Sequence, residues 1–297
     1  MGQDTRNDPA MPELPSPLID LLSAESFAAE HLPGSVNICV YETAFIDKIR
    51  AAFPDLNGVL TVYGLNDSTL EARVALTKLG AAGYTQVTAL PGGLEGWKAG
   101  GGKIEQGAAP ELPSGQFEVD QKASLVEWMG RNLFSRHVGT VQLGSGQILI
   151  KDGRLTGGHL TVDMTSLRCL DIPDPAMSAH LIAHLRSDDF FSVERYPQAE
   201  LQIREVNYRS NVRLDQPNYQ IKGDFTLRGV TNPIDFATVV ARKSDGSFTA
   251  QALLDLDRTL WGANYGSAKF FGRLGQHVVN DEFHLQFKVV TKDKPVT

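Results

Sequence analysis

The sequence "DEFHLQFKVVTK", residues 281–292, decides the fold of the larger part of this chain. Apolar side chains occupy positions 283, 285, 287 and 289, and polar ones occupy 284, 286 and 288. A repeat of two residues places the two sets on opposite faces of a strand, so this stretch predicts an antiparallel strand with one apolar and one solvated face. The stretch "SFTAQALLDLDR", residues 247–258, has the same alternation.

A long antiparallel sheet exposes two edges, and closing it into a β-barrel removes them. A barrel of about eight strands is either filled by its own side chains or encloses one ligand, and patterning alone favours the filled interior. One segment departs from the alternation: residues 174–191 are expected to be helical through about Arg186. The side chains expected to point inward are Phe248, Leu254, Leu256, Phe283, Leu285 and Phe287.

The chain is long enough for two cores, and its composition changes at "AGGGKIEQGAAPELPSGQ", residues 99–116, which has the chemistry of a linker. We therefore expect a disordered tail at 1–13, an α/β domain at 14–100, a linker at 101–115 and the barrel domain at 116–293. In the α/β domain, short apolar runs at 18–22, 59–64 and 86–90 predict buried parallel strands. Ser68, three residues before Glu71, has the spacing of a helix capping box.

The formal net charge of −7 argues against nucleic acid as a partner. No apolar run is long enough for a membrane span, and the polar first residues do not form a signal peptide, so the cytoplasm is the expected location. Cys39 and Cys169 belong to no CxxC motif and are expected to be reduced. A homodimer remains an open alternative.

Three segments of the first part resemble the rhodanese domain: "LIDLLSAESFAAEHLPGSVNI" (18–38), "VLTVYG" (59–64) and "ALPGGLEGW" (89–97). The resemblance implies a loop whose backbone N–H groups surround a reactive cysteine, and Gly64 stands at that position. The domain is therefore expected to be catalytically inactive and to serve as a regulatory or interaction module with an anion-friendly loop. Two alternatives stay open, a domain kept for stability and a sulfurtransferase or other enzyme using an atypical residue. The loop comprises Gly64, Leu65, Asn66, Asp67, Ser68 and Thr69.

Three segments of the second part resemble the YceI-like family: "LTGGHLTVDMTSL" (155–167), "HLRSDDFFSVERYPQAEL" (184–201) and "IKGDFTLRGVTNPIDF" (221–236). The resemblance covers about 117–290. It implies a lipocalin-like barrel that binds an isoprenoid lipid, such as a polyprenyl chain or a quinone, in a hollow interior, and so reverses the preference for a filled core. The expected partner is a long-chain apolar small molecule, and no other cofactor is expected.

Several side chains are candidates for the ligand site. Consecutive aromatic residues such as Phe190 and Phe191 are expected at the rim or in the cavity. Asp163, Arg258 and His137 form either a polar cluster that receives a head group or a buried salt bridge with a tied-down turn. His180 and His184, four apart on the predicted helix, are weak candidates for a metal site. The full set of expected ligand-binding residues is Trp128, Phe134, His137, Asp163, Phe190, Phe191, Phe248, Leu254, Arg258, Trp261, Tyr265, Phe283 and Leu285.

Overall fold

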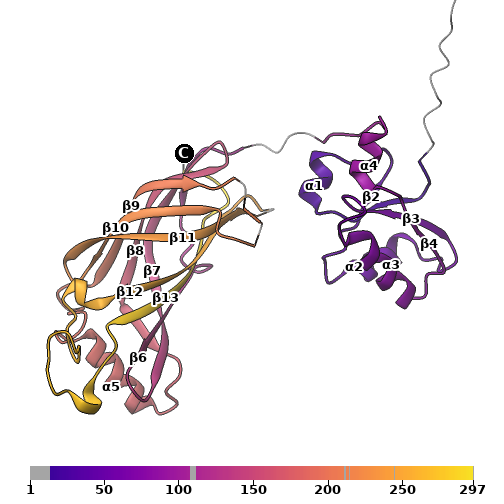
Figure 1. Cartoon of the computed structure of the whole chain (residues 1–297). Helices are drawn as coiled ribbons and strands as arrows, with labels where there is room; N and C mark the ends of the chain where they lie inside the picture. The colour runs from indigo at the N-terminus through magenta and orange to yellow at the C-terminus, as the bar shows by residue number, and fades with distance from the viewer. Residues whose placement is uncertain (1–13, 108–111, 211, 214, 244, 297) are drawn as a thin grey trace, which may run out of the picture. The chain divides into compact units, whose positions relative to one another are not determined.

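The computed structural model describes residues 14–107, 112–210, 212, 213, 215–243 and 245–296. The tail predicted at residues 1–13 lies outside the described residues. The described chain divides into two compact units, 14–107 and 112–296, each with its own hydrophobic core (Figure 1). The division falls inside the predicted linker.

The first unit is an α/β fold built on a four-stranded parallel sheet with the order β2–β1–β3–β4. Helices α2 and α3 contribute Ile49 and Leu79 to the core on one face, and α4 contributes Leu94 to the core on the other. The predicted α/β class is confirmed. The elements are β1 (Leu18–Asp20), α1 (Ala24–Ala29), β2 (Val36–Asn37), α2 (Phe45–Ala52), β3 (Val59–Tyr63), α3 (Glu71–Ala81), β4 (Gln86–Ala89) and α4 (Gly93–Ala99).

Two details of this unit differ from the sequence-based expectation. Ser68 does not cap α3, because its N–H and hydroxyl both donate to the Asn66 side chain, and Leu70 is the N-cap residue. The first unit also extends beyond residue 100, since the backbone of Glu105 pairs with that of His31. The Trp97 indole fixes this extension by donating to the Lys103 carbonyl at 2.8 Å.

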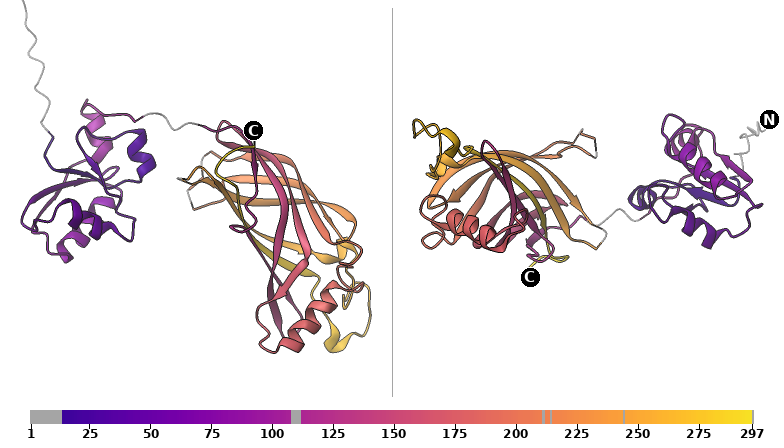
Figure 2. Two further views of the ribbon diagram at one scale, coloured as in Figure 1. Left: turned by 180° about the vertical axis from the view of Figure 1, so that it is seen from behind. Right: turned by 90° about the horizontal axis from the view of Figure 1, so that it is seen from below.

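The second unit is a closed antiparallel barrel of eight strands, β6 to β13, as predicted. The strands follow one another around the barrel in the order β7–β6–β13–β12–β11–β10–β9–β8, and β8 pairs back onto β7. Figure 2 shows the strands surrounding the barrel axis. The elements are β5 (Gly115–Glu118), β6 (Leu125–Arg131), β7 (Arg136–Lys151), β8 (Arg154–Cys169), α5 (Pro175–Arg186), β9 (Gln198–Tyr208), β10 (Tyr219–Leu227), β11 (Val230–Arg242), β12 (Phe248–Asp257), η1 (Arg258–Trp261), η2 (Gly275–His277) and β13 (Glu282–Val290).

Because neighbouring strands run in opposite directions, alternate connections lie at the same end of the barrel. The β6–β7, β8–β9, β10–β11 and β12–β13 connections lie at one end, together with α5, and we call it the α5 end (Figure 1). Helix α5 begins where Asp174 accepts a hydrogen bond from the Met177 N–H at 2.8 Å, with Pro175 in the first turn. It ends at Arg186, as the sequence predicts.

None of the helices in the described part of the chain combines the length and the apolar character that a membrane crossing requires.

Candidate functional site

The barrel contains a cavity of about 420 Å³. All eight barrel strands and α5 contribute to its wall. Inward side chains such as Phe283, Leu285 and Phe287 pack against the core but remain partly exposed, because they also face this space. The connection at residues 276–280, at the α5 end, also lines it, and the cavity is partly open to solvent there. The barrel is therefore hollow at this end.

Gly139 on β7 leaves room for the Trp128 ring in the cavity wall. Trp128 on β6 pairs with Gly139 on β7, and a Cβ atom at residue 139 would overlap the Trp128 indole and the Arg168 carbonyl. The indole therefore lies across the glycine and donates to the Thr140 carbonyl at 3.3 Å. A side chain at residue 139 would therefore displace the Trp128 ring from the cavity wall.

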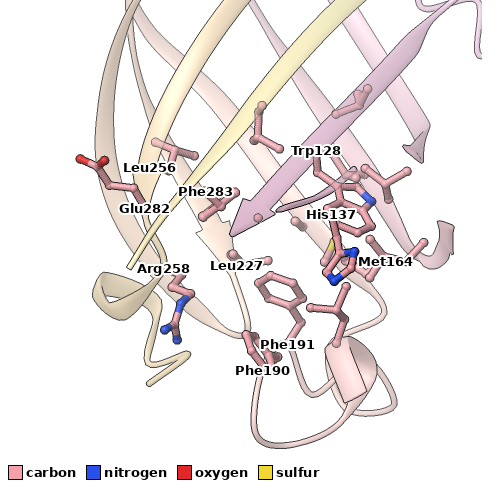
Figure 3. Close-up of a pocket in the computed structure, with 18 of the residues that line it drawn as sticks. Trp128, His137, Met164, Phe190, Phe191, Leu227, Leu256, Arg258, Glu282 and Phe283 are labelled. Atoms are coloured by element: carbon pink, nitrogen blue, oxygen red, sulfur yellow. The ribbon is translucent and has the colours of Figure 1, made fainter. Parts of the chain in front are cut away.

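Polar residues line the outer part of the cavity, while its deeper wall is apolar; the carboxylate of one of them, Glu282, points away from the cavity (Figure 3). We call this set the polar ring. It consists of Arg131, Asn132, His137, His184, Arg258, Gln276, His277, Asn280 and Glu282. A long ligand with one polar end would match this separation, with its tail inside and its polar end at the ring.

Arg258 is the most buried charge of the ring, at 3% exposure. Its guanidinium donates to the Asn280 and Val279 carbonyls at 3.0 Å each and to the Ala263 carbonyl. Burial lowers the pKa of Arg258, and the nearby Asp281 carboxylate, 3.6 Å away, partly offsets this. Since its hydrogen bonds go to backbone carbonyls, Arg258 holds the 263–280 segment in place.

A cluster of aromatic side chains connects α5 to the segment at residues 262–274. The His184 ring makes edge-to-face contacts with Phe190 and Tyr265, with centroid distances of 5.0 and 4.5 Å. His184 Nε2 also lies 3.4 Å from the Asp189 carboxylate. These contacts hold α5 beside the opening of the cavity.

His137, another residue of the polar ring, contacts an acidic side chain. Its Nδ1 lies 3.1 Å from the Asp171 carboxylate, which also accepts hydrogen bonds from the Val138 N–H and the Cys169 thiol. Burial alone would raise the pKa of Asp171, but these hydrogen bonds outweigh it and lower the pKa. The carboxylate therefore stays ionised and orients the His137 ring.

An aromatic pair borders the cavity. The Phe236 ring on β11 and the Phe287 ring on β13 meet edge to face, with centroids 5.8 Å apart. A second void of about 30 Å³ lies beyond them and shares Leu160, Leu201, Phe287 and Val289 with the main cavity. Phe287 therefore lies between the two voids, and Phe236 lines only the smaller one.

Most of the predicted ligand-binding residues line the main cavity. Their role in binding stays a prediction. The predicted residues in its wall are Trp128, His137, Phe190, Phe191, Leu254, Arg258, Tyr265, Phe283 and Leu285, with His184 from the weak metal candidates.

Four predicted residues lie elsewhere. Phe134 is 75% exposed on the β6–β7 hairpin. Phe248 packs on Phe117 and lines only the smaller void. Trp261 is a core residue whose indole donates to the Phe225 carbonyl at 2.9 Å. Asp163 accepts hydrogen bonds from the Thr165 N–H and hydroxyl, which ties down a local turn.

Of the two alternatives for Asp163, Arg258 and His137, the polar cluster of all three is not formed, whereas a buried Arg258–Asp281 ion pair and a turn tied down by Asp163 are present. His137 and Arg258 both belong to the polar ring, but Asp163 does not join them, because it faces Thr165. His180 is exposed, whereas His184 lines the cavity. Among the described residues no group of three His, Cys, Asp or Glu side chains could hold a metal ion.

Sequence reasoning missed much of the polar ring. Asn132, Gln276, His277, Asn280 and Glu282 belong to connections or strand ends, where no periodicity marks them. The usable signal was topological: in an up-and-down barrel, the β6–β7 and β12–β13 connections must share one end.

The rhodanese-like loop of the first unit satisfies its own backbone. The Asn66 side chain accepts hydrogen bonds from the N–H groups of Ser68 and Thr69, at 2.9 and 3.2 Å. The Asn66 N–H donates to the Thr69 hydroxyl, and Asp67 accepts from the Gly92 N–H at 2.9 Å. Leu65 contributes a carbonyl that accepts from the Glu95 N–H. The N–H groups of Ser68 and Thr69 thus bond within the loop, while the backbone N–H of Leu65 interacts with the Glu71 carboxylate. The anion-friendly character of the loop stays a prediction.

The space beside Gly64 holds the carboxylate of Glu71, the first residue of α3. A Cβ atom at residue 64 would lie 2.8 Å from both Cβ and Oε2 of Glu71. Glu71 is 8% exposed, its Oε1 accepts from the Tyr41 hydroxyl at 2.7 Å, and its Oε2 has no hydrogen-bond partner among the described residues. Burial would raise the pKa of Glu71, but the hydroxyls of Thr69 and Tyr41 and nearby backbone N–H groups lower it. Burial, reinforced by Glu71, raises the pKa of Tyr41 to about 12.

A closed antiparallel barrel around an open apolar cavity defines the lipocalin-like class of barrels. The model of the YceI-like domain matches residues 117–291, and the chain belongs to this family. The model of the rhodanese-like domain matches residues 5–100, so the chain joins two recognisable domains.

Individual relatives match parts of the chain. A UPF0312 protein of Photorhabdus laumondii is 41% identical over 51 residues, which are 17% of this chain and 23% of that protein. The solved structure of BcnA from Burkholderia cenocepacia is 19% identical, covers 58% of this chain and 98% of its own, and has a TM-score of 0.46. A polyisoprenoid binding domain from Saccharophagus degradans is 16% identical, covers 60% of this chain and 98% of its own, and has a TM-score of 0.44.

Proposed function

We propose that the barrel binds a long-chain apolar small molecule, namely an isoprenoid lipid or a quinone with an isoprenoid tail. The observation that carries the proposal is the open cavity of about 420 Å³ with an apolar interior and a polar ring at its mouth. Small-molecule pockets typically measure about 300–1,000 Å³ and combine an apolar wall with a few polar groups. The isoprenoid identity rests on the family resemblance.

The hydrophobic effect supplies the affinity for such a ligand. Each CH₂ group moved from water into the cavity contributes about 0.8 kcal/mol, which is about fourfold in affinity. Such a wall does not distinguish one hydrocarbon from another by hydrogen bonds. Selectivity for the polar end of the ligand then falls to residues of the ring such as His137 and Asn280.

For the first unit we propose a regulatory or interaction role without sulfur transfer. Gly64 provides no nucleophile, and the Glu71 carboxylate fills the adjacent space. A negative charge at this place disfavours both a thiolate and an anionic sulfur donor.

Organic extraction of the purified full-length protein, followed by mass spectrometry, tests the barrel function. Two neighbouring residues of β12 provide a matched pair of variants: Leu254 faces the cavity, while Leu253 is 74% exposed on the outside. We expect Leu254→Trp to lose the co-purified lipid, because the larger ring fills the cavity, and Leu253→Trp to retain it. Circular dichroism of both variants shows whether the barrel remains folded.

A lipid that co-purifies equally with both folded variants would place the binding site outside the cavity. Absence of any apolar molecule from the extract, together with no binding of added prenyl alcohols, would refute the proposal.

A further inference from the structure

Two loops at the α5 end display large apolar side chains that neither the core nor the cavity uses. The first is "RNLFSR", residues 131–136, where Leu133 is 59% and Phe134 is 75% exposed. The second is "KFFGR", residues 269–273, where Phe270 is 57% and Phe271 is 49% exposed. We call these two segments the mouth loops. Clustered exposure of this kind marks an interaction surface.

The segment at residues 279–280 links the first mouth loop to Gly266, which precedes the second mouth loop by three residues. The Asn280 N–H donates to the Arg131 carbonyl at 3.0 Å, and Asn132 forms a bridge with Val279. The Val279 N–H in turn donates to the Gly266 carbonyl at 2.9 Å, close to the second mouth loop. The lining of the cavity includes Arg131, Asn132, Val279 and Asn280. The exposed apolar side chains of the mouth loops, which we call the apolar tips, therefore belong to segments that reach the cavity.

Local hydrogen bonds hold both tips in their exposed conformations. The Asn132 side chain accepts from the N–H groups of Phe134 and Ser135, each at 2.8 Å. The buried Ser267 carbonyl accepts from the N–H groups of Phe270 and Phe271, at 3.2 and 3.0 Å. The aromatic rings are thus displayed by ordered turns.

Arginines flank the apolar tips. Arg131 and Arg136 border the first mouth loop and Arg273 ends the second, and none of the three has an ion-pair partner among the described residues. Of the acidic side chains nearby, Asp257 and Asp281 both contact Lys269, whereas Glu282 forms no ion pair among the described residues. Apolar tips bordered by unpaired cations match an anionic bilayer surface, where rings enter the acyl boundary and arginines meet phosphates.

We propose that the mouth loops dock the barrel on an anionic phospholipid bilayer, so that the cavity opens toward the membrane interior. The proposal rests on the proposed function in one respect: a long-chain apolar ligand resides in a bilayer and not in water, and it must cross the rim to enter. The docking contact itself depends only on the mouth loops.

Flotation of the full-length protein with vesicles tests the docking. The vesicles are phosphatidylcholine alone and phosphatidylcholine with phosphatidylglycerol. We expect binding to the mixed vesicles, and a reduction of about a hundredfold in the variant with Phe134→Ser and Phe270→Ser, since each of the two rings removed costs about tenfold. Arg136→Gln with Arg273→Gln should lose the preference for phosphatidylglycerol.

The matched control is Leu253→Ser, because Leu253 has the same exposure as Phe134, 74% against 75%, but lies in the barrel wall. It should bind vesicles like the unaltered protein. No binding of the unaltered protein to either vesicle, or equal loss in the control, would overturn docking. A dimer in vesicle-free solution that Phe134→Ser converts to monomer would instead assign the surface to a second copy of the chain.

The proposed ligand binding and the proposed membrane docking can be refuted independently of each other. If the protein binds vesicles but no lipid is ever found in the cavity, the ligand-binding function is refuted and docking stands. If lipid co-purifies but the mouth-loop variants bind vesicles as well as the unaltered chain does, docking is refuted alone. Leu254→Trp should lose the lipid and keep vesicle binding.

Discussion

Gly64 has no side chain, and a neighbouring side chain packs into the space that one would occupy. Glu71 fills the space next to Gly64, and Tyr41 fixes the carboxylate by a 2.7 Å hydrogen bond. The resemblance to the rhodanese domain predicts a cysteine at the position of Gly64. The sequence did not predict that the Glu71 carboxylate is buried beside Gly64, because the spacing of Glu71 from Ser68 indicated a capping residue at the start of a helix.

Gly64→Ala is expected to destabilise the first unit by about 1–3 kcal/mol, because the added Cβ must displace Glu71. Gly80→Ala is the matched control: Gly80 lies in α3 with no atom within 4 Å of the Cβ position, so alanine there should be neutral or stabilise by up to about 1 kcal/mol. Urea unfolding of both variants measures the difference. Equal stabilities would show that Glu71 moves away without cost.

The same packing bears on sulfur chemistry. In Gly64→Cys the thiol would lie beside the Glu71 carboxylate, which raises a thiol pKa and disfavours the thiolate. The loop N–H groups of Ser68 and Thr69 would still donate to Asn66. Restoring the cysteine alone therefore leaves the loop unsuited to hold a thiolate.

At the scale of the strands, the Phe236–Phe287 pair determines how much of the barrel is open. Both residues belong to the alternating apolar pattern of β11 and β13, and nothing in that pattern distinguishes a ring that lines a cavity from a ring that closes it. The structure separates these roles, because Phe287 lines both the main cavity and the void of about 30 Å³, whereas Phe236 lines only the smaller void.

Phe287→Ala is expected to join the two voids and allow longer prenyl chains to bind. Because each added CH₂ contributes about fourfold in affinity until the cavity is full, affinity along a series of prenyl alcohols should level off at a longer chain in the variant. Phe117→Ala is the control, since Phe117 is fully buried but lines neither void. An unchanged plateau in Phe287→Ala would show that this ring does not limit the cavity.

The strands, the closed barrel and the end of α5 at Arg186 followed from the sequence because periodicity and turn residues are local signals. The capping of α3 did not, since Asn66 competes for the Ser68 donors. Patterning favoured a filled interior. Apolar residues at alternate positions describe a packed and a hollow barrel equally well, and only the distances between strands separate the two.

The candidate site was predictable in its wall and only in part at its mouth, where His137, His184 and Arg258 were candidates. Leu254 and Leu285 lie on strands, where alternation assigns their direction. The ring residues Asn132 and His277 lie in connections, and their convergence depends on contacts between segments more than a hundred residues apart, such as the Asn132–Val279 bridge. Phe134 was expected at the ligand, but its place at the hairpin tip exposes it.

At the scale of the whole molecule, the hydrophobic cores of the two units share no residue. Such units usually unfold as separate cooperative transitions. We therefore expect the full chain to show two thermal transitions. A prenyl ligand at about one hundred times its dissociation constant stabilises the domain that binds it by about 2.7 kcal/mol, which raises the melting temperature of a domain of this size by roughly 5–10 °C.

Only the barrel transition should move when the ligand is added, because every residue lining the cavity belongs to the second unit. Differential scanning calorimetry with and without ligand measures both transitions in one sample, and Leu254→Trp should abolish the shift while Leu253→Trp preserves it. An unmoved first transition favours an interaction role for the rhodanese-like unit, since a regulatory coupling requires ligand binding in one unit to change the free energy of the other. A shift of both transitions would contradict this and establish regulation.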